Sequence, residues 1–201
     1  MSAPEKPIKV VGFNGSAKKD GNTAKLLEMV FTELRKEGIE CEMVMVGNAD
    51  HVRGCRGCNG CKATGKCVHA TPGDPVNEWY AKMMEADGII LGSPTHYAAV
   101  SVEMKSLIDR CGWISMVSGG TLKNKIGAAV VAVRRGGAIS VFDQINHFFT
   151  ISQMHIVGSS YWNEGIGLKP GDVENDEEGK RTMANLGKNM AFVLKKMKKE
   201  D

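Results

Sequence analysis

Apolar residues recur along this chain in five short runs that are rich in Val, Ile and Met. The runs lie at residues 8–13, 40–46, 87–93, 125–133 and 154–160. Short and nearly continuous apolar runs are typical of buried strands in a parallel sheet, because both faces of such a sheet are covered. We therefore expect five parallel strands.

The segments between these runs carry apolar residues at the spacing of amphipathic helices. The first predicted helix begins near Asn22 and Thr23, which are favoured residue types at helix starts, and stops at Gly38. The second opens at Asp74, and the last covers roughly residues 178–198. The apolar faces of the five helices are marked by Leu26, Leu27, Val30, Phe31, Leu34, Trp79, Met83, Met84, Val102, Leu107, Ile108, Cys111, Ile139, Phe142, Ile145, Phe148, Phe149, Met183, Leu186, Met190, Val193 and Met197.

Strands that alternate with helices require right-handed crossovers and a sheet covered on both faces, which is the doubly wound α/β pattern. A chain of 201 residues can bury one full core, so we expect a single domain over residues 1–201. The polar stretch 171–180 is expected to be a loop within it. Ligands of such sheets bind beyond the carboxyl ends of the strands. The loops after the first, third and fourth strands are therefore the candidate site.

Composition and charge exclude several classes of protein. With 42% hydrophobic and 24% charged residues, the chain is neither disordered nor fibrous. Its net charge of +3 is small and its lysines are not interleaved with aromatic residues, so nucleic acid is not an expected partner. The first residues contain no apolar stretch long enough for export or membrane insertion. We expect a cytoplasmic protein without a membrane partner.

The loop at residues 12–23, between the first strand and the first helix, has the chemistry of a phosphate site. Its glycines permit a tight turn, and the backbone amides freed at a helix N-terminus stabilise an anion. Ser16, Asn22 and Thr23 offer side-chain donors there, and Lys18 adds positive charge at the rim.

Other phosphate loops fit this segment less well. A nucleoside triphosphate loop needs Gly, four residues and then Gly-Lys-Ser/Thr, whereas five residues separate Gly15 from Gly21 and Asn22 replaces the lysine. The G-x-G-x-x-G pattern of dinucleotide sites is absent. A monophosphate such as FMN remains, and so does a helix capped by Asn or Thr that binds no ligand.

The loop after the third strand is expected to contact a flat ring. Pro94 and the small residues Ala98 and Ala99 let the backbone come close, and its amides are placed to bond the flavin N5 and carbonyl edge. His96 and Tyr97 are placed to border the ring. Because strand-to-helix loops often carry an aromatic residue that only packs on its neighbours, a purely structural role stays open for both.

The loop after the fourth strand repeats the tight turn with Gly136 and Gly137. Arg134 or Arg135 would stabilise negative charge on a reduced flavin. The alternative is a solvated pair of arginines, since surface arginines need no ligand.

Four cysteines with the spacing C-x2-C-x2-C-x5-C form a cysteine-rich loop at about residues 53–70: Cys55, Cys58, Cys61 and Cys67. Three thiolates at two-residue intervals can wrap three corners of a [4Fe-4S] cluster, and the longer gap lets the fourth return. A structural zinc site usually takes two separated C-x-x-C pairs. Zinc and reduced free thiols remain the alternatives. Cys41 and Cys111 are expected in the core.

Three segments together resemble the NAD(P)H-dependent FMN reductase and iron–sulfur flavoprotein families: GSAKKDGNT, SPTHYAAVSVEMKSLIDR and RRGG. The resemblance implies a flavodoxin-like sheet with strand order 2-1-3-4-5, a homodimer or homotetramer with the flavin near the subunit boundary, and a [4Fe-4S] cluster on the cysteine motif. It implies phosphate contacts from Ser16, Lys18, Asn22 and Thr23, and ring contacts from Pro94, Thr95, His96 and Tyr97.

The function expected from these features is an FMN-dependent oxidoreductase. Its electron donor would be NAD(P)H or reduced ferredoxin, and its acceptor a small molecule or a protein. No catalytic side chain is expected, because the flavin carries the chemistry of hydride transfer. Two other hypotheses stay open: a non-enzymatic electron carrier, and a cysteine-based redox sensor.

Overall fold

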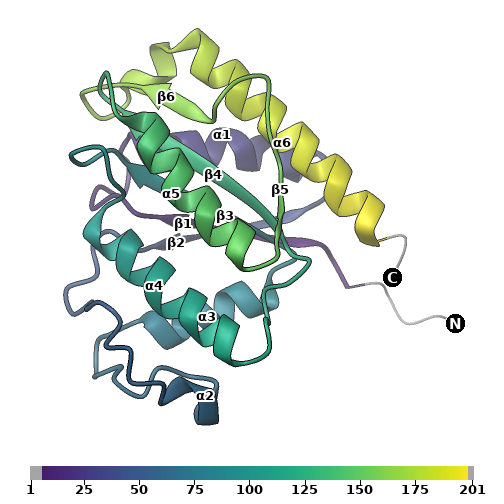
Figure 1. The fold of residues 1–201 in the computed structure, drawn as a ribbon. Coiled ribbons are helices and arrows are strands. Elements are labelled where there is room, and N and C mark those ends of the chain that lie inside the picture. Colours follow the sequence, from purple (N-terminus) through teal and green to yellow (C-terminus); the bar gives the residue numbers. More distant parts are fainter. Residues whose placement is uncertain (1–5, 199–201) are drawn as a thin grey trace, which may run out of the picture.

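The computed structural model describes residues 6–198. Residues 1–5 and 199–201, which the expected single domain also includes, lie outside the described residues. The strands, seen in Figure 1, are β1 (Lys9–Asn14), β2 (Glu40–Met45), β3 (Gly88–Pro94), β4 (Ile126–Val133), β5 (His155–Ile156) and β6 (Glu164–Ile166). The helices are α1 (Asn22–Lys36), α2 (Cys61–Thr64), α3 (Val76–Glu85), α4 (Val102–Val117), α5 (Ala138–Ile151), α6 (Glu177–Lys198) and the 3-10 turn η1 (Asp172–Asn175).

The strands form one parallel sheet in the order β2-β1-β3-β4-β5, which confirms the predicted flavodoxin-like order. The prediction of five strands was wrong in one respect, because β6 also pairs with β4 and makes the sheet six-stranded. β5 pairs with only the first residues of β4, and the chain later returns to the same edge of β4 as β6.

The reason for the extra strand lies along β4. The predicted fifth strand, residues 154–160, pairs with β4 over two residues only. Beyond them Asn163 continues the bonding, with its Nδ2 donating to the Ala129 carbonyl at 3.0 Å and its carbonyl accepting from the Val131 amide at 2.9 Å. β6 then pairs with the last residues of β4. The long buried strand β4 therefore pairs along one edge with two short strands, β5 and β6.

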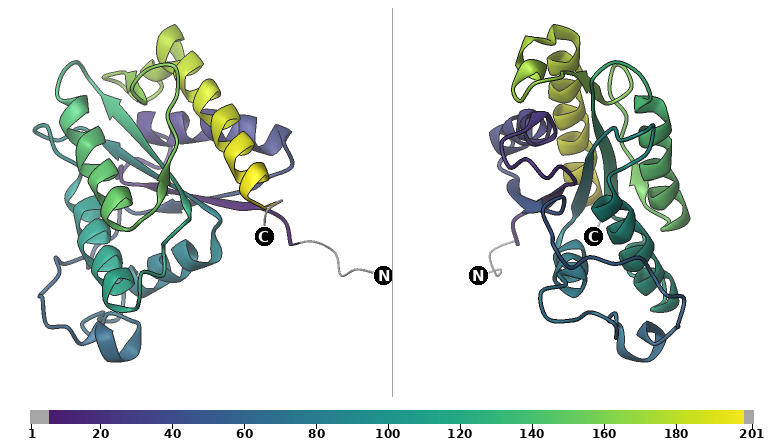
Figure 2. Two further views of the ribbon diagram at one scale, coloured as in Figure 1. Left: turned by 45° about the vertical axis from the view of Figure 1, so that its right-hand side comes forward. Right: turned by 90° about the vertical axis from the view of Figure 1, so that its left-hand side faces the viewer.

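The helices form a layer on each face of the sheet, as the edge-on view in Figure 2 shows. Helices α1 and α6 pack with one apolar cluster, and α3, α4 and α5 with the other. Three side chains expected on the apolar faces are exposed: Met84 (40%), Val102 (77%) and Ile139 (39%). Met84 and Val102 stand near helix ends, and Ile139 lies two residues before the buried Val141, which turns it toward solvent.

The polar stretch 171–180 is not a simple loop. It contains η1 and the first residues of α6, which begins at Glu177, one residue before its expected start. Among the described residues, no helix combines the length and the apolar character needed to cross a membrane.

Candidate functional site: a cleft at the strand ends and a cysteine cavity

The loops after β1, β3 and β4 meet around a cavity of about 360 Å³ at the carboxyl edge of the sheet. Three of the predicted site residues do not line this cavity: Tyr97, Gly136 and Gly137. The predicted residues that do line it are Ser16, Lys18, Asn22, Thr23, Pro94, Thr95, His96 and Arg134. The fold thus brings segments more than a hundred residues apart to one place.

The phosphate loop is held by its backbone and by one buried side chain. The Gly15 amide donates to the Gly92 carbonyl at 2.7 Å, which ties the loop to β3. Asn14 is fully buried, and its Oδ1 accepts from the Ser16 amide at 3.0 Å. The Ser16 hydroxyl in turn accepts from the Lys18 amide at 3.2 Å. These hydrogen bonds within the protein therefore hold the conformation of the loop without a contribution from a ligand.

The first turn of α1 supplies unpaired donors. No side chain caps the helix at Gly21, and no acidic residue stands in its first turn. The amides of Asn22, Thr23 and Ala24 have no acceptor among residues 6–198. Unpaired amides and the positive end of the helix dipole favour an anion, so a phosphate group fits this position.

A fourth segment, missed in the sequence, closes the cavity: Gly167, Leu168 and Pro170 line it. The Asn22 Oδ1 accepts from the Gly171 amide at 2.8 Å, across 149 positions of sequence, which leaves its Nδ2 as a donor. A Cβ on Gly167 would stand 2.8 Å from that Nδ2. The glycines and the proline of its Gly-Leu-Lys-Pro-Gly sequence are typical of a loop, and they were the signal by which the sequence could have revealed this segment.

Gly47, which follows β2, also shapes the phosphate loop without lining the cavity. A Cβ there would stand 2.3 Å from the Gly15 carbonyl oxygen and 2.6 Å from the Ala17 amide nitrogen. These are backbone atoms, which cannot rotate away as a side chain can. Only glycine allows β2 and the phosphate loop to approach this closely.

The loop after β3 makes a tight turn. His96 and Ala99 exchange two backbone hydrogen bonds of 3.0 Å, and Tyr97 and Ala98 between them adopt positive φ angles of 50° and 58°. The turn directs the Tyr97 side chain into solvent, where it is fully exposed. Thr95 anchors the loop to β4, since its amide and its hydroxyl both donate to the Ala132 carbonyl.

The loop after β4 packs against that turn. Gly137 has a φ of 93°, and a Cβ there would stand 3.2 Å from Ala98, so this position requires glycine for both its angle and its space. Arg134 and Arg135 are both exposed, and only Arg134 lines the cavity. The structure thus separates the two arginines that the sequence left equivalent.

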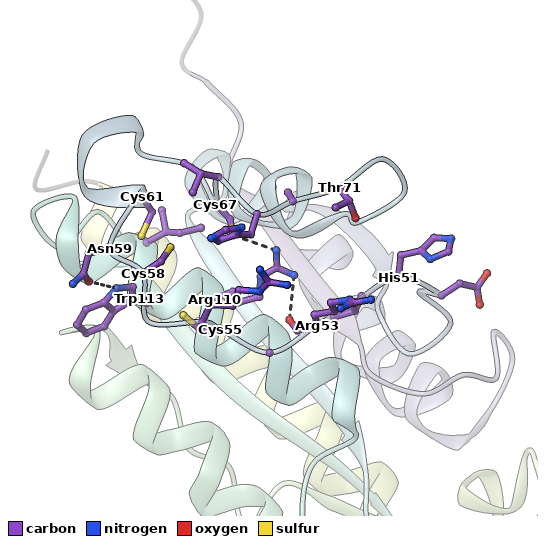
Figure 3. A pocket seen from close by; sticks show the side chains of 18 residues that line it. His51, Arg53, Cys55, Cys58, Asn59, Cys61, Cys67, Thr71, Arg110 and Trp113 are labelled. Carbon is purple, nitrogen blue, oxygen red and sulfur yellow. Dashed lines mark hydrogen bonds between the residues drawn. The ribbon is translucent and has the colours of Figure 1, made fainter.

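A second cavity, of about 480 Å³, lies outside the sheet in the segment between β2 and α3. All four motif cysteines line it, and Figure 3 shows their side chains around Arg110 of α4. Cys55 and Cys58 are exposed, whereas Cys61 is buried and begins α2. Burial and the neighbouring thiols of Cys55, Cys58 and Cys67 raise the pKa of Cys61.

The donor set of this cavity can be compared with the needs of different metal sites. Within residues 6–198, no three His, Cys, Asp or Glu side chains are grouped closely enough to hold a single ion. A polynuclear cluster holds its ligands further apart, because each thiolate binds a different iron atom. By its chemistry, a soft donor set of four thiols lining one roomy cavity fits an iron–sulfur cluster.

Side chains from the helices hold the cysteine segment in place. The buried Arg110 donates from Nη2 to the Cys67 Sγ at 3.2 Å and from Nη1 to Asp74 at 2.7 Å. Asn77 of α3 accepts from the Cys67 amide at 2.7 Å and donates to its carbonyl at 3.1 Å. Trp113 donates to the Asn59 Oδ1 at 3.1 Å. The sequence did not reveal Arg110, although a charged residue on the buried face of a helix was a signal.

The two remaining cysteines lie apart from this cavity. Cys111 is fully buried in α4, and burial raises its pKa. Cys41 lies half-buried in β2, where burial raises its pKa to about 11. Neither lines the cysteine cavity, in line with the expected core positions.

Comparisons with known proteins agree with this geometry. Residues 8–168 match the family model of the NADPH-dependent FMN reductases. An iron–sulfur flavoprotein of Methanocaldococcus jannaschii is 41% identical over 199 residues, covering 96% of this chain and 100% of the relative. A WrbA-like flavodoxin of Agrobacterium tumefaciens has a TM-score of 0.63 at 16% identity, covering 95% of this chain and 99% of its own. RosB with bound 8-demethyl-8-formylriboflavin-5′-phosphate has a TM-score of 0.75 at 14% identity, covering 96% and 81%. The chain therefore belongs to the NADPH-dependent FMN reductase family.

Proposed function

We propose that this chain is an FMN-dependent oxidoreductase that takes electrons from NAD(P)H or reduced ferredoxin and passes them to a small molecule or a protein. The observation that carries the proposal is the uncapped N-terminus of α1, whose Asn22 and Thr23 line a cavity shared with the loops after β3 and β4. A phosphate is favoured there because the amides are unpaired and the helix dipole is positive.

Each loop of the cleft has a proposed part in holding FMN. Side chains of the first loop would bind the phosphate, and backbone and side chains of the second would border the ring. FMN, when bound, supplies the redox chemistry, since a flavin takes up a hydride or single electrons without a side-chain acid or base. Arg134 would stabilise negative charge at the ring edge, and Gly136 and Gly137 would let the backbone approach. The proposed phosphate contacts are Ser16, Lys18, Asn22 and Thr23, and the ring contacts Pro94, Thr95, His96 and Tyr97, of which Tyr97 would act through its backbone because its side chain points into solvent.

We further propose that the four cysteines of the second cavity hold a [4Fe-4S] cluster, which supplies one-electron exchange when bound. Convergence of all four side chains on one cavity supports this, as does the name of the relative from Methanocaldococcus jannaschii. Zinc and free thiols are the other occupancies to be tested.

The charge around the cysteine cavity supports an anionic electron partner. Residues 51–73 contain no acidic residue, and they carry the exposed Arg53, Arg56, Lys62 and Lys66. A basic surface beside a redox site attracts acidic partners and speeds their association. This observation supports an anionic electron partner at this cavity, such as an acidic ferredoxin.

Exposed apolar side chains near the cleft support the expected homodimer or homotetramer. Tyr97, Val102 and Leu168 stand on or beside the loops of the cleft and are all exposed. Apolar surface of this kind, close to a ligand site, often marks an interface. Light scattering of the flavin-loaded protein measures the subunit number, and a monomer at micromolar concentration would exclude this part of the proposal.

A direct test begins with anaerobically purified protein. Its absorption spectrum, its iron and acid-labile sulfide content, and chromatography of the released flavin identify what it binds. Stopped-flow reduction by NADH, NADPH and reduced ferredoxin then identifies the donor. Absence of FMN would overturn the main proposal. Reduction by ferredoxin alone, without turnover on NAD(P)H, would leave the electron-carrier hypothesis in its place.

The phosphate contact can be tested separately with Asn22→Asp. The new carboxylate still accepts from the Gly171 amide, and a negative charge at a helix N-terminus stabilises the helix. It also repels phosphate, so FMN should bind about tenfold more weakly while riboflavin, which lacks the phosphate, binds as before. Asn189→Asp on the exposed face of α6 adds the same charge outside the cleft and is the control; it also loses the Asn189 bond to the Gly158 carbonyl, which does not line the cleft. Equal weakening for both flavins would exclude the assigned phosphate position.

A further inference from the structure

Arg110 occupies an unusual position for an arginine. Its side chain is 3% exposed, and it is paired with the side chain of Asp74, which is 2% exposed. Its guanidinium contacts three points of the cysteine segment: the Cys67 Sγ at 3.2 Å, Asp74 at 2.7 Å and the Arg53 carbonyl at 3.2 Å. Figure 3 shows it between Cys67 and Arg53. One side chain of α4 thus binds both ends of the cysteine segment.

The contact with sulfur indicates what the site holds. A neutral thiol is a weak acceptor, whereas a thiolate, free or bound to iron, accepts a charge-assisted hydrogen bond. A buried guanidinium donor is costly unless every donor is well matched. Asp74 and the Arg53 carbonyl satisfy one side of the guanidinium, and the Cys67 Sγ receives the other. The arrangement is well matched when that sulfur carries negative charge.

Cys67 is half-buried and is held more firmly than the two exposed cysteines of the motif. Asn77 fixes its backbone from α3, and Arg110 fixes its sulfur from α4. Cys55 and Cys58 are exposed, and no hydrogen bond to their sulfur atoms is present within residues 6–198. Cys67 is also the cysteine that breaks the two-residue spacing. Its place in the cavity therefore depends on the helices rather than on its own loop.

We propose that Arg110 is a positioning residue that fixes Cys67 as the fourth cluster ligand and raises the reduction potential of the bound cluster. The inference rests on the proposed [4Fe-4S] site. Reduction adds a negative charge to the cluster, and a nearby cation and a hydrogen bond to a ligating sulfur both favour the reduced form. Loss of Arg110 should therefore lower the cluster potential.

Three variants separate this role from a general need for the buried ion pair. Arg110→Gln combined with Asp74→Asn removes both charges, so neither is left buried alone. Asp74→Asn alone keeps the bond from Arg110 to Cys67 and removes the negative charge, so it should shift the potential upward. Arg110→Lys keeps the charge but loses the guanidinium fork. Arg56→Gln, an exposed arginine that lines the same cavity, is the matched control.

The measurements are iron and sulfide per chain, a redox titration followed by electron paramagnetic resonance, and the FMN potential in the same sample. In the double variant, the ratio of reduced to oxidised cluster at a fixed potential should fall about tenfold, or about 59 mV for a one-electron couple. Arg56→Gln should change it by less than about threefold, because solvent screens exposed charges. The FMN potential should stay constant as an internal reference.

A downward shift in the double variant with an upward shift in Asp74→Asn supports the inference, since structural damage alone does not change sign. Loss of iron from a double variant that still binds FMN, with iron retained in Arg110→Lys, supports the positioning role. A double variant that matches Arg56→Gln overturns the inference while the proposed cluster stands. Wild-type protein without acid-labile sulfide overturns both and identifies the proposed cluster as the point of failure.

Discussion

The two candidate sites are built by different means. In the cleft, each loop is joined to the neighbouring strand through the backbone: the Gly15 amide donates to the Gly92 carbonyl of β3, and the Thr95 amide donates to the Ala132 carbonyl of β4. The cysteine segment lies beyond the sheet edge, and side chains of α3 and α4 hold it, namely Asn77, Arg110 and Trp113. The cleft follows from the topology of the sheet, whereas the cysteine cavity depends on a few individual side chains.

The largest effect is expected from Gly47→Ala, which tests whether the cleft depends on its backbone. The added methyl group would overlap backbone atoms of Gly15, Ser16 and Ala17 at 2.3–2.6 Å, so the phosphate loop must shift. We expect FMN affinity to fall more than about a hundredfold, or about 3 kcal/mol, although Gly47 does not line the cavity. Isothermal titration with the apoprotein measures this.

The control for this substitution is Gly158→Ala. A Cβ at Gly158 has no atom within 4 Å, and its φ is not in the left-handed region. Its FMN affinity should match that of the wild type, and iron content should be unchanged in both variants. Normal FMN binding by Gly47→Ala would contradict the idea that close backbone approach shapes the phosphate loop.

This difference between the sites also explains how much the sequence could predict. Apolar runs identified the strands, and the loop at residues 12–23 identified one wall of the cleft, because both are local patterns. The wall formed by Gly167 and Pro170 was missed, since only folding brings it to Asn22. β6 was missed for a similar reason, because its short run pairs only after the chain returns to β4.

In the cysteine segment, the candidate ligands were predictable from the sequence, but the side chains that hold the segment were not. Its motif named four candidate ligands directly, because ligand spacing is a local pattern. The side chains that hold it were not predictable in the same way: Arg110 lies 43 positions beyond the Cys67 that it contacts. A charge among Leu107, Cys111 and Ile114 on one helix face signals a buried partner, but periodicity alone does not identify that partner.

The next largest effect concerns the reactivity of the cysteines. In reduced apoprotein at pH 8, Cys55 and Cys58 should react readily with iodoacetamide because they are exposed. The raised pKa of Cys41, about 11 against an ordinary 9.0, lowers its thiolate fraction at this pH about a hundredfold. Cys111 should react only on unfolding, because it is fully buried. Mass spectrometry of timed samples measures each rate.

The labelling rate of Cys41 should also depend on pH. A thiol with a raised pKa stays mostly protonated past pH 9, so the labelling rate of Cys41 should keep rising about tenfold per pH unit until pH approaches 11, whereas that of an ordinary thiol levels off near pH 9. Protein unfolded in urea should lose this difference. Rapid labelling of native Cys41 at pH 8 would contradict its half-buried position in β2.

A smaller effect is expected where a side chain supports the cleft. The Gln144 Nε2 donates to the Ala98 carbonyl at 3.3 Å, and its Oε1 accepts from the Val100 amide at 3.4 Å. These bonds are long, so Gln144→Ala should cost about 1 kcal/mol and weaken FMN binding about fivefold. The exposed neighbour Asp143→Ala is the control. An effect as large as that of Gly47→Ala would show that the cleft also depends on single side chains.

The smallest effect separates Arg134 from Arg135, which the sequence could not distinguish. Both are exposed, but only Arg134 lines the cleft. Exposed charges contribute at most about 1 kcal/mol, so Arg134→Gln should weaken FMN binding about threefold and Arg135→Gln hardly at all. The difference should shrink at 1 M salt, where the screening length falls to about 3 Å. Equal effects of the two substitutions would mean that neither arginine acts on the ligand, and that the cleft depends on its backbone donors alone.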